Sequence, residues 1–156
     1  MFRSLMLCAI GAFTLSNMGC APPAERSDTG EIASSGSVDA FTIRVGDCFD
    51  DQSGTVVNDV PGVPCNEPHD NEVYAAFDVQ MSEWPGEDVV TEMAENGCLD
   101  RFEEVVGIPY EESVLIVSHL IPTEQSWKAR KDREILCVAY HMDLEKLTRS
   151  VIGSGM

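Results

Sequence analysis

The stretch Val45–Tyr74, VGDCFDDQSGTVVNDVPGVPCNEPHDNEVY, decides the fold of this 156-residue chain. It contains two cysteines, Cys48 and Cys65, and a Pro-His-Asp corner at residues 68–70. From residue 72 to residue 79, apolar and polar side chains alternate, and this alternation predicts a β-strand with one solvent-exposed face.

The segments around this stretch predict an α+β fold of about five mainly antiparallel strands with one helix packed on a face. A helix is expected over residues 87–106, because apolar residues recur there at three- and four-residue steps and Gly107 ends the pattern. The strands are expected at residues 41–45, 55–60, 72–79, 113–121 and 134–142. Residues 113–121 are apolar on both faces, which favours a central position in the sheet. Residues 122–132 are expected to form a long polar connection.

Four cysteines lie in the predicted domain, and an even set in a small exported protein is typical of a disulfide framework. Four cysteines allow three pairings. Cys98 falls on the apolar face of the expected helix and Cys137 in the middle of the last strand, so these two are well placed to bond. Cys48 would then pair with Cys65. A zinc site is less favoured, because no two of these cysteines have C-x-x-C spacing.

Residues 1–19 predict a secretory signal peptide, because they contain no acidic residue and include an apolar run too short to span a bilayer. The Gly19-Cys20 pair is typical of a bacterial lipoprotein, in which Cys20 is acylated and holds the chain at the outer face of the cytoplasmic membrane. Asn17 departs from that pattern, and an ordinary cleaved signal is the alternative. Residues 20–37 predict a flexible tether with a reach of about 20–25 Å, and residues 38–156 the folded domain.

The formal net charge of −17 excludes non-specific binding to nucleic acids, because a polyanion of this size is repelled by phosphates. The acidity favours solubility and a basic partner.

The VGDC motif at residues 45–48, the PHD-x-EVY motif at residues 68–74 and the late Trp127 resemble the septum-formation domain family of Gram-positive bacteria. The resemblance covers roughly residues 43 to 152, including all four cysteines of the domain. It implies an exported or membrane-anchored envelope protein linked to septum formation, and it implies no particular reaction. One departure is Lys131, where the family usually has a glycine before the Asp-Arg pair.

The weak candidates for catalysis are His69, Asp70 and Glu72, because an imidazole beside carboxylates can act as an acid or base or bind a metal. The structural alternative is a His-Asp corner that hydrogen-bonds the backbone of the loop between Cys48 and Cys65. The chain has no standard zinc spacing, no phosphate loop and no nucleophile elbow. We therefore predict no cofactor, and no motif identifies a catalytic residue.

Three other polar features have structural alternatives. His119 and His141 are expected in central strands, where ordinary strand histidines are favoured over zinc ligands. An oxygen-rich turn could suit calcium, but its spacing does not match an EF-hand, and a solvated turn is favoured. The residues of this turn are Asp47, Asp50, Asp51 and Ser53.

The segment from Trp127 to Arg133 predicts a partner surface, because it concentrates basic residues beside a tryptophan on a very acidic protein. Its residues are Trp127, Lys128, Arg130, Lys131 and Arg133. In the alternative interpretation, Trp127 packs in the core and the basic side chains neutralise nearby carboxylates.

Together these patterns favour a non-enzymatic, membrane-tethered binding or scaffold lipoprotein of the cell envelope. Its expected partners are the membrane, through the lipid on Cys20, and an envelope protein, a division protein or a wall polymer. The alternatives are a small extracytoplasmic hydrolase or metal-dependent enzyme centred on His69, and a surface lipoprotein with no role in division.

Overall fold

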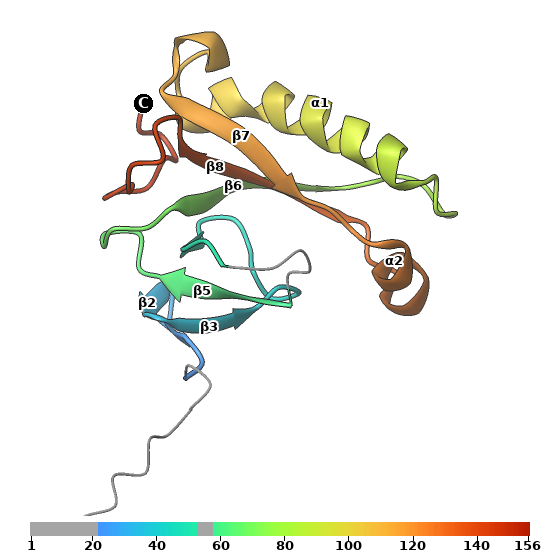
Figure 1. Ribbon diagram of the computed structural model, residues 1–156, viewed down its shortest axis with the longest axis horizontal. Coiled ribbons are helices and arrows are strands. Elements are labelled where there is room, and N and C mark those ends of the chain that lie inside the picture. The colour runs from blue at the N-terminus through green and yellow to red at the C-terminus, as the bar shows by residue number, and fades with distance from the viewer. Residues whose placement is uncertain (1–21, 53–57) are drawn as a thin grey trace, which may run out of the picture.

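The computed structural model describes residues 22–52 and 58–156 (Figure 1). The expected signal peptide and Cys20 lie outside these ranges, as does Ser53. Neither helix in the described ranges is both long and apolar enough to cross a membrane.

A six-stranded sheet in the order β3-β5-β4-β6-β8-β7 forms the frame of the domain, and each neighbouring pair is antiparallel. A separate pair, β1-β2, is also antiparallel. The α+β class is therefore confirmed, with more strands than the five expected. The strands are β1 (Glu25–Arg26), β2 (Ile32–Ser34), β3 (Gly36–Asp39), β4 (Cys48–Phe49), β5 (Asp59–Val63), β6 (Asn71–Asp78), β7 (Leu115–Leu120) and β8 (Glu134–His141).

Helix α1 (Glu87–Val106) has the limits expected from the sequence. Gly107 ends it in the left-handed conformation with φ of 93°, which glycine adopts without a steric cost. The helix lies along one face of β6, β8 and β7 (Figure 1). Its buried residues recur every four positions, which places them on one stripe toward the sheet: Val90, Ala94, Cys98, Phe102 and Val106.

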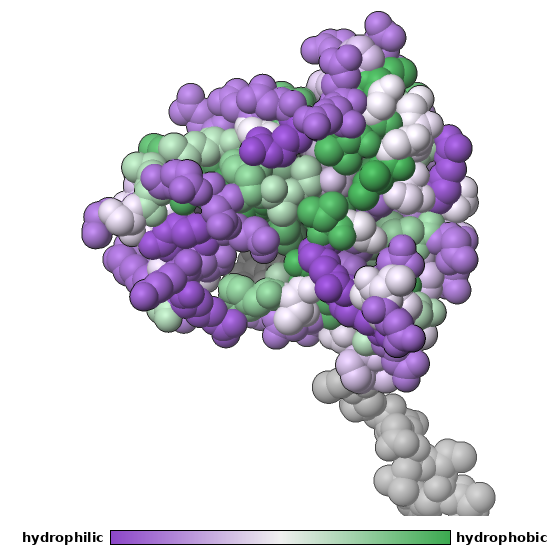
Figure 2. All heavy atoms as spheres, turned by 180° about the vertical axis from the view of Figure 1, so that it is seen from behind, coloured by the Kyte–Doolittle hydropathy of each residue, from purple (hydrophilic) through white to green (hydrophobic). Residues whose placement is uncertain are grey.

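Two apolar clusters fill the two faces of the sheet. On the α1 side, Phe102 packs edge-to-face against Tyr74 with ring centroids 5.7 Å apart. On the other side, Ile32 and Val38 pack with Val138 and its neighbours. Seen from behind, apolar atoms form a band through the middle of the molecule, bordered by hydrophilic side chains (Figure 2).

The expected flexible tether at residues 20–37 is not what the structure shows from residue 22 onward. This segment forms β1, β2 and the first half of β3, and Ile32 within it and Val38 just after it are buried. The backbone partners come from β5, where Val38 faces Val60. The segment contains too few apolar residues to show a periodic pattern. Its folding is therefore visible only in the structure, where β3 pairs with β5.

Four further expectations were wrong. Residues 41–45 do not form a strand, and β5 does not end at residue 60, where the expected strand ended, but continues through Pro61 and Gly62 to Val63. Strand β7 lies at an edge of the sheet, although its sequence favoured a central position; α1 covers one of its faces. The expected polar connection contains a second helix, α2 (Glu124–Arg130), and a short 3₁₀ helix, η1 (Tyr110–Glu112), precedes β7.

The disulfide between Cys98 and Cys137 joins α1 to β8, as expected, with the two Cα atoms 5.3 Å apart. Replacing both cysteines by alanine should lower the free energy of unfolding by about 4 kcal/mol, because the unfolded chain then loses the constraint of a long closed loop. Urea denaturation of the variant and the wild type measures this difference. A loss below about 1 kcal/mol would contradict the stabilising role.

Candidate functional site

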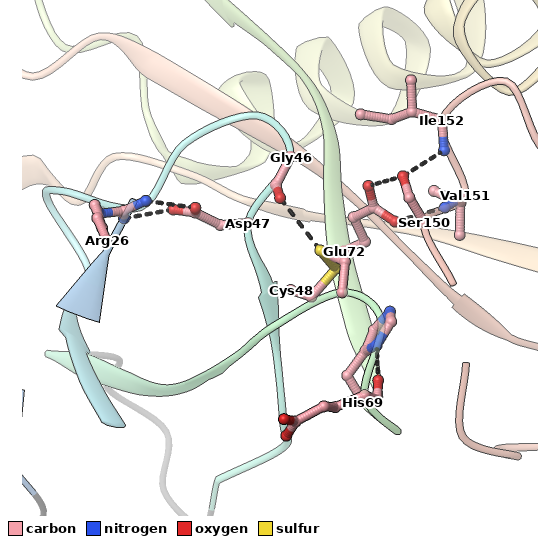
Figure 3. The surroundings of a disulfide bond; sticks show 11 residues. Arg26, Gly46, Asp47, Cys48, His69, Glu72, Ser150, Val151 and Ile152 are labelled. Carbon is pink, nitrogen blue, oxygen red and sulfur yellow. Dashed lines mark hydrogen bonds and ion pairs between the residues drawn. A yellow bond between two sulfur atoms is a disulfide. The ribbon is translucent and has the colours of Figure 1, made fainter. Parts of the chain in front are cut away.

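The stretch that includes both sequence motifs folds around the second disulfide, Cys48–Cys65, whose Cα atoms lie 5.2 Å apart (Figure 3). The pairing is the one expected. Cys48 belongs to β4, which is paired to β5 on one side and β6 on the other. The disulfide therefore joins the middle of the sheet to the loop that leads into β6.

Asp47, next to this disulfide, is buried and forms a two-pronged ion pair with Arg26 of β1. The Arg26 guanidinium donates to Oδ1 at 2.6 Å and to Oδ2 at 2.7 Å, and the backbone N–H of Arg44 donates to the same carboxylate at 3.0 Å. A buried carboxylate needs such partners. The ion pair therefore holds the N-terminal hairpin against the VGDC loop.

Glu72 of β6 is fully buried and receives two hydrogen bonds from the C-terminal segment. The hydroxyl of Ser150 donates to Oε1 at 2.6 Å, and the N–H of Val151 donates to Oε2 at 2.5 Å (Figure 3). Burial raises the pKa of Glu72, and the two hydrogen bonds oppose that increase. This carboxylate joins the sheet to the last residues of the chain.

His69 is also fully buried, and its two ring nitrogens differ. Nδ1 lies 2.7 Å from the carbonyl oxygen of Glu67, whereas Nε2 is buried and has no hydrogen-bond partner among the described residues. The backbone of His69 exchanges two hydrogen bonds with that of Leu147. These contacts are structural, but they differ from the expected corner, because Glu67 and Leu147 both lie outside the loop between Cys48 and Cys65.

The side chains of the three weak catalytic candidates do not converge on a common point. The Asp70 carboxylate faces outward, where it accepts from Lys146 at 2.8 Å and from the backbone N–H of Asp51 at 2.9 Å. Glu72 lies on the opposite side, near His69. His69 and Asp70 are therefore adjacent in sequence without forming an acid-base pair.

A cavity of about 800 Å³ opens beside Glu72 and the disulfide. Its walls come from the β1-β2 hairpin, the VGDC loop, the segment from Pro64 to Asn66, Glu72 of β6 and the C-terminal segment. His69 is not among the lining residues, whereas Cys65 and Glu72 are. Polar and charged residues at the cavity include Thr29, Arg44, Asn66, Thr148, Arg149 and Ser150.

The side chains of the basic segment around α2 fall into two groups, one packed against the core and one exposed to solvent. Trp127 is 2% exposed and its indole N–H donates to the carbonyl of Ser82 at 3.2 Å. Arg133 stacks over Trp127 at 3.6 Å and donates to the carbonyls of Met81 and Ser82. Trp127 therefore packs in the core and does not contribute an exposed anchor, as our alternative interpretation stated.

Three basic residues of the segment remain exposed: Lys128, Arg130 and Lys131. Arg130 stacks at 4.0 Å over Phe41, which is 50% exposed, and Lys128 pairs with Glu124 one helical turn away. Lys131 has φ of 58°, the left-handed conformation that glycine favours. The turn before the Asp-Arg pair therefore keeps the backbone expected of glycine.

The other polar candidates do not form sites together. Asp47 faces Arg26, Asp50 pairs with Lys146 at 2.8 Å, and Asp51 accepts from Asn71. The carboxylates of the acidic turn thus have separate partners. His119 lies on the edge strand β7, so its expected central position was wrong, whereas His141 is the last residue of β8, which lies between β6 and β7 inside the sheet as expected.

Sequence reasoning missed three residues that complete the site: Arg26, Ser150 and Val151. Arg26 was assigned to the tether, and the last strand was expected to end at residue 142, so no role was predicted for Ser150 and Val151. A single buried acid such as Glu72 gives no signal of its own, because the strand pattern placed it on the exposed face.

Replacing Arg26 by alanine should lower the free energy of unfolding by about 3 kcal/mol, because Asp47 would stay buried without its ion-pair partner. The matched control is Lys128→Ala, which removes an exposed ion pair and should cost no more than about 0.5 kcal/mol. Chemical denaturation of both variants tests the difference, and equal losses would contradict it.

Glu72→Gln should change how stability depends on pH. The pKa of Glu72 is raised in the folded state above its ordinary value of 4.5, so the folded protein holds this proton to higher pH than the unfolded chain. The wild type should therefore lose stability relative to the variant as the pH rises above about 4.5. Melting temperatures across that range measure the trend, and parallel curves would refute it.

The comparisons with known proteins agree with this geometry. The sequence model of the family described as Septum formation matches residues 45–153, well over half of the chain. No curated protein and no solved structure matches. The matched range includes both disulfides, Glu72 and its two hydrogen-bond donors, and it excludes the N-terminal hairpin. With two disulfides and this match, the chain is an extracellular or envelope protein and belongs to the Septum formation family.

Proposed function

We propose that the protein is a non-enzymatic, membrane-tethered binding module of the cell envelope that contributes to septum formation. Family membership supports the link to the septum, and the two disulfides support an extracytoplasmic location. The binding role rests on one observation, the cavity beside Glu72.

The cavity has the size and lining of a binding site. Its volume of about 800 Å³ lies in the range of ligand pockets, roughly 300–1,000 Å³. The two buried carboxylates that line it already have protein partners, since Asp47 is paired with Arg26 and both oxygens of Glu72 accept hydrogen bonds. These partners support a binding role for the cavity rather than catalysis by these two carboxylates.

The alternative, an enzyme centred on His69, has less support. The imidazole is fully buried and does not line the cavity, and the Asp70 carboxylate is held elsewhere by Lys146. A general base has to reach the proton that it removes. His69 fits a structural role in the corner beside the disulfide better.

The proposed anchor is a lipid on Cys20. The described chain is already paired at Pro22, whose carbonyl accepts from the N–H of Ser37 at 2.8 Å. Only one residue separates Cys20 from this paired backbone. A lipid on Cys20 would therefore place the domain close to the membrane surface. The reach of 20–25 Å that we expected from a free tether would not apply.

The exposed basic residues of α2 provide a second surface for an anionic partner. Lys128, Arg130 and Lys131 are exposed, and Arg130 stacks over the half-exposed ring of Phe41. An arginine stacked on an aromatic ring is a common anchor at interfaces. A wall polymer or an acidic envelope protein has the complementary charge.

Crosslinking in cells followed by purification of the captured envelope material tests the proposal. Thr148→Trp, which places a large ring at the mouth of the cavity, should reduce capture at least about tenfold. Asn96→Trp is the control, because Asn96 is exposed on α1 away from this cavity. Equal capture by the two variants would contradict a role of the cavity.

The same capture tests the basic surface separately. Changing Lys128, Arg130 and Lys131 to glutamine lowers the net charge by three units. A control with Gln52→Glu, Gln80→Glu and Asn96→Asp makes the same change at other exposed positions. Reduced capture only in the first variant supports the surface, and no difference between the two removes it.

A further inference from the structure

Three buried side chains at the disulfide have the arrangement of metal ligands. One ligand atom each of Cys48, His69 and Glu72 lies within 4.8 Å of the others. They come from β4, from the corner before β6 and from β6 itself, so the sheet fixes their positions. All three residues are 0% exposed.

The hydrogen bond of His69 favours the imidazole tautomer that a metal ligand requires. The Glu67 carbonyl can only accept, so the hydrogen bond at 2.7 Å puts the proton of the neutral ring on Nδ1. Nε2 then carries a lone pair and is buried with no partner among the described residues. Metal-binding histidines commonly donate their other ring N–H to a backbone carbonyl in this way.

The free nitrogen of His69 faces the rest of the cluster. In Figure 3 this nitrogen points away from the Glu67 carbonyl, on the side where the disulfide and Glu72 lie. A buried polar atom without a partner costs free energy, so its presence needs an explanation. Coordination of a metal would provide the missing partner.

Glu72 is oriented by the kind of outer contacts that metal ligands have. Ser150 and Val151 each donate one hydrogen bond to it, and each carboxylate oxygen retains a second lone pair. Hydrogen-bonded carboxylates of this kind keep a fixed direction. The carboxylate can therefore bind a metal without losing its contacts to the C-terminal segment.

The disulfide is what keeps Cys48 from acting as a ligand, because thiolates bind metals and disulfide sulfurs do so poorly. Cys65 is partly exposed and lines the cavity, whereas Cys48 is fully buried. A dithiol reductant can therefore reach the sulfur of Cys65 from the cavity. Cys98 and Cys137 of the other disulfide are both 0% exposed, which protects that bond.

We propose that this cluster is a zinc site that forms when the Cys48–Cys65 disulfide is opened. The ligands are the side chains of Cys48, Cys65, His69 and Glu72. Two sulfurs, one imidazole nitrogen and one carboxylate oxygen suit Zn²⁺, which is bound tetrahedrally at about 2.0–2.3 Å. The donor atoms of Cys48, His69 and Glu72 already lie within 4.8 Å of one another, and Cys65 enters the site as the disulfide partner of Cys48, whose side chain can rotate once the bond is opened.

The chemistry of opening is ordinary thiol–disulfide exchange. A thiolate of an extracytoplasmic dithiol attacks Sγ of Cys65, and the bond to Cys48 breaks with the electron pair on the Cys48 sulfur. The second thiol of the reductant then releases Cys65, and the reductant leaves as its own disulfide. Binding of Zn²⁺ displaces the protons of the two protein thiols. The zinc site shares Cys65 and Glu72 with the lining of the cavity, but the inference does not rest on the proposed binding function, because metal binding is measured without any envelope ligand.

Metal titration of the protein in both redox states tests the proposal. The protein is reduced with a phosphine that does not bind zinc, and thiol alkylation with mass spectrometry identifies the opened disulfide. Co²⁺, used as a coloured substitute for Zn²⁺, should then bind once per chain with the absorption of a tetrahedral thiolate site. The oxidised protein should bind at least about a hundredfold more weakly. Failure of the reduced protein to bind would overturn the proposal.

Variants distinguish this site from adventitious binding by free thiols. His69→Ala and Glu72→Gln should each weaken Co²⁺ binding at least about tenfold, and Ser150→Ala should do so through the orientation of Glu72. His119→Ala, on the edge strand, is the matched control and should bind like the wild type. Unchanged binding in both His69→Ala and Glu72→Gln would overturn the proposal. If reduction unfolds the chain, circular dichroism should show that Zn²⁺ restores the fold, and its failure to do so would also overturn it.

Discussion

The burial of Glu72 is the constraint on which the rest of the site depends. A carboxylate in the middle of a sheet is stable only with partners, and the structure supplies both from residues 150 and 151. This brings the C-terminal segment over β6, where Leu147 also pairs with the backbone of His69. Four residues of the C-terminal segment therefore form one wall of the cavity: Thr148, Arg149, Ser150 and Ile152.

The N-terminal hairpin is held against the same place by a second buried charge. Asp47 is paired with Arg26, so the two ends of the described chain meet on either side of the VGDC loop. The match to the Septum formation family begins at residue 45 and does not include the hairpin. The cavity thus combines walls from the family domain with one wall that this chain adds from outside the matched range.

In the segment around α2, the tryptophan packs in the core while three of the basic residues stay exposed. A tryptophan among basic residues predicted an exposed anchor, but the indole packs against Trp84 in the core and Arg133 covers it. The capping contacts between Thr123 and Ser126 start a helix too short to show a clear period. That helix turns Trp127 inward and leaves Lys128, Arg130 and Lys131 at the surface.

The sequence by itself determined α1, β6 and β8. Each of these elements has a long, regular spacing of apolar residues with clear signals at its ends, and such a pattern depends only on residues within the element. The sequence also indicated the family and both disulfides. Only the tertiary structure decided that residues 22–39 fold, that β7 lies at an edge, and that Glu72 and His69 share one buried cluster with Cys48. These features depend on contacts between segments distant in the chain, and the partners of a buried charge leave no periodic pattern in the sequence around it.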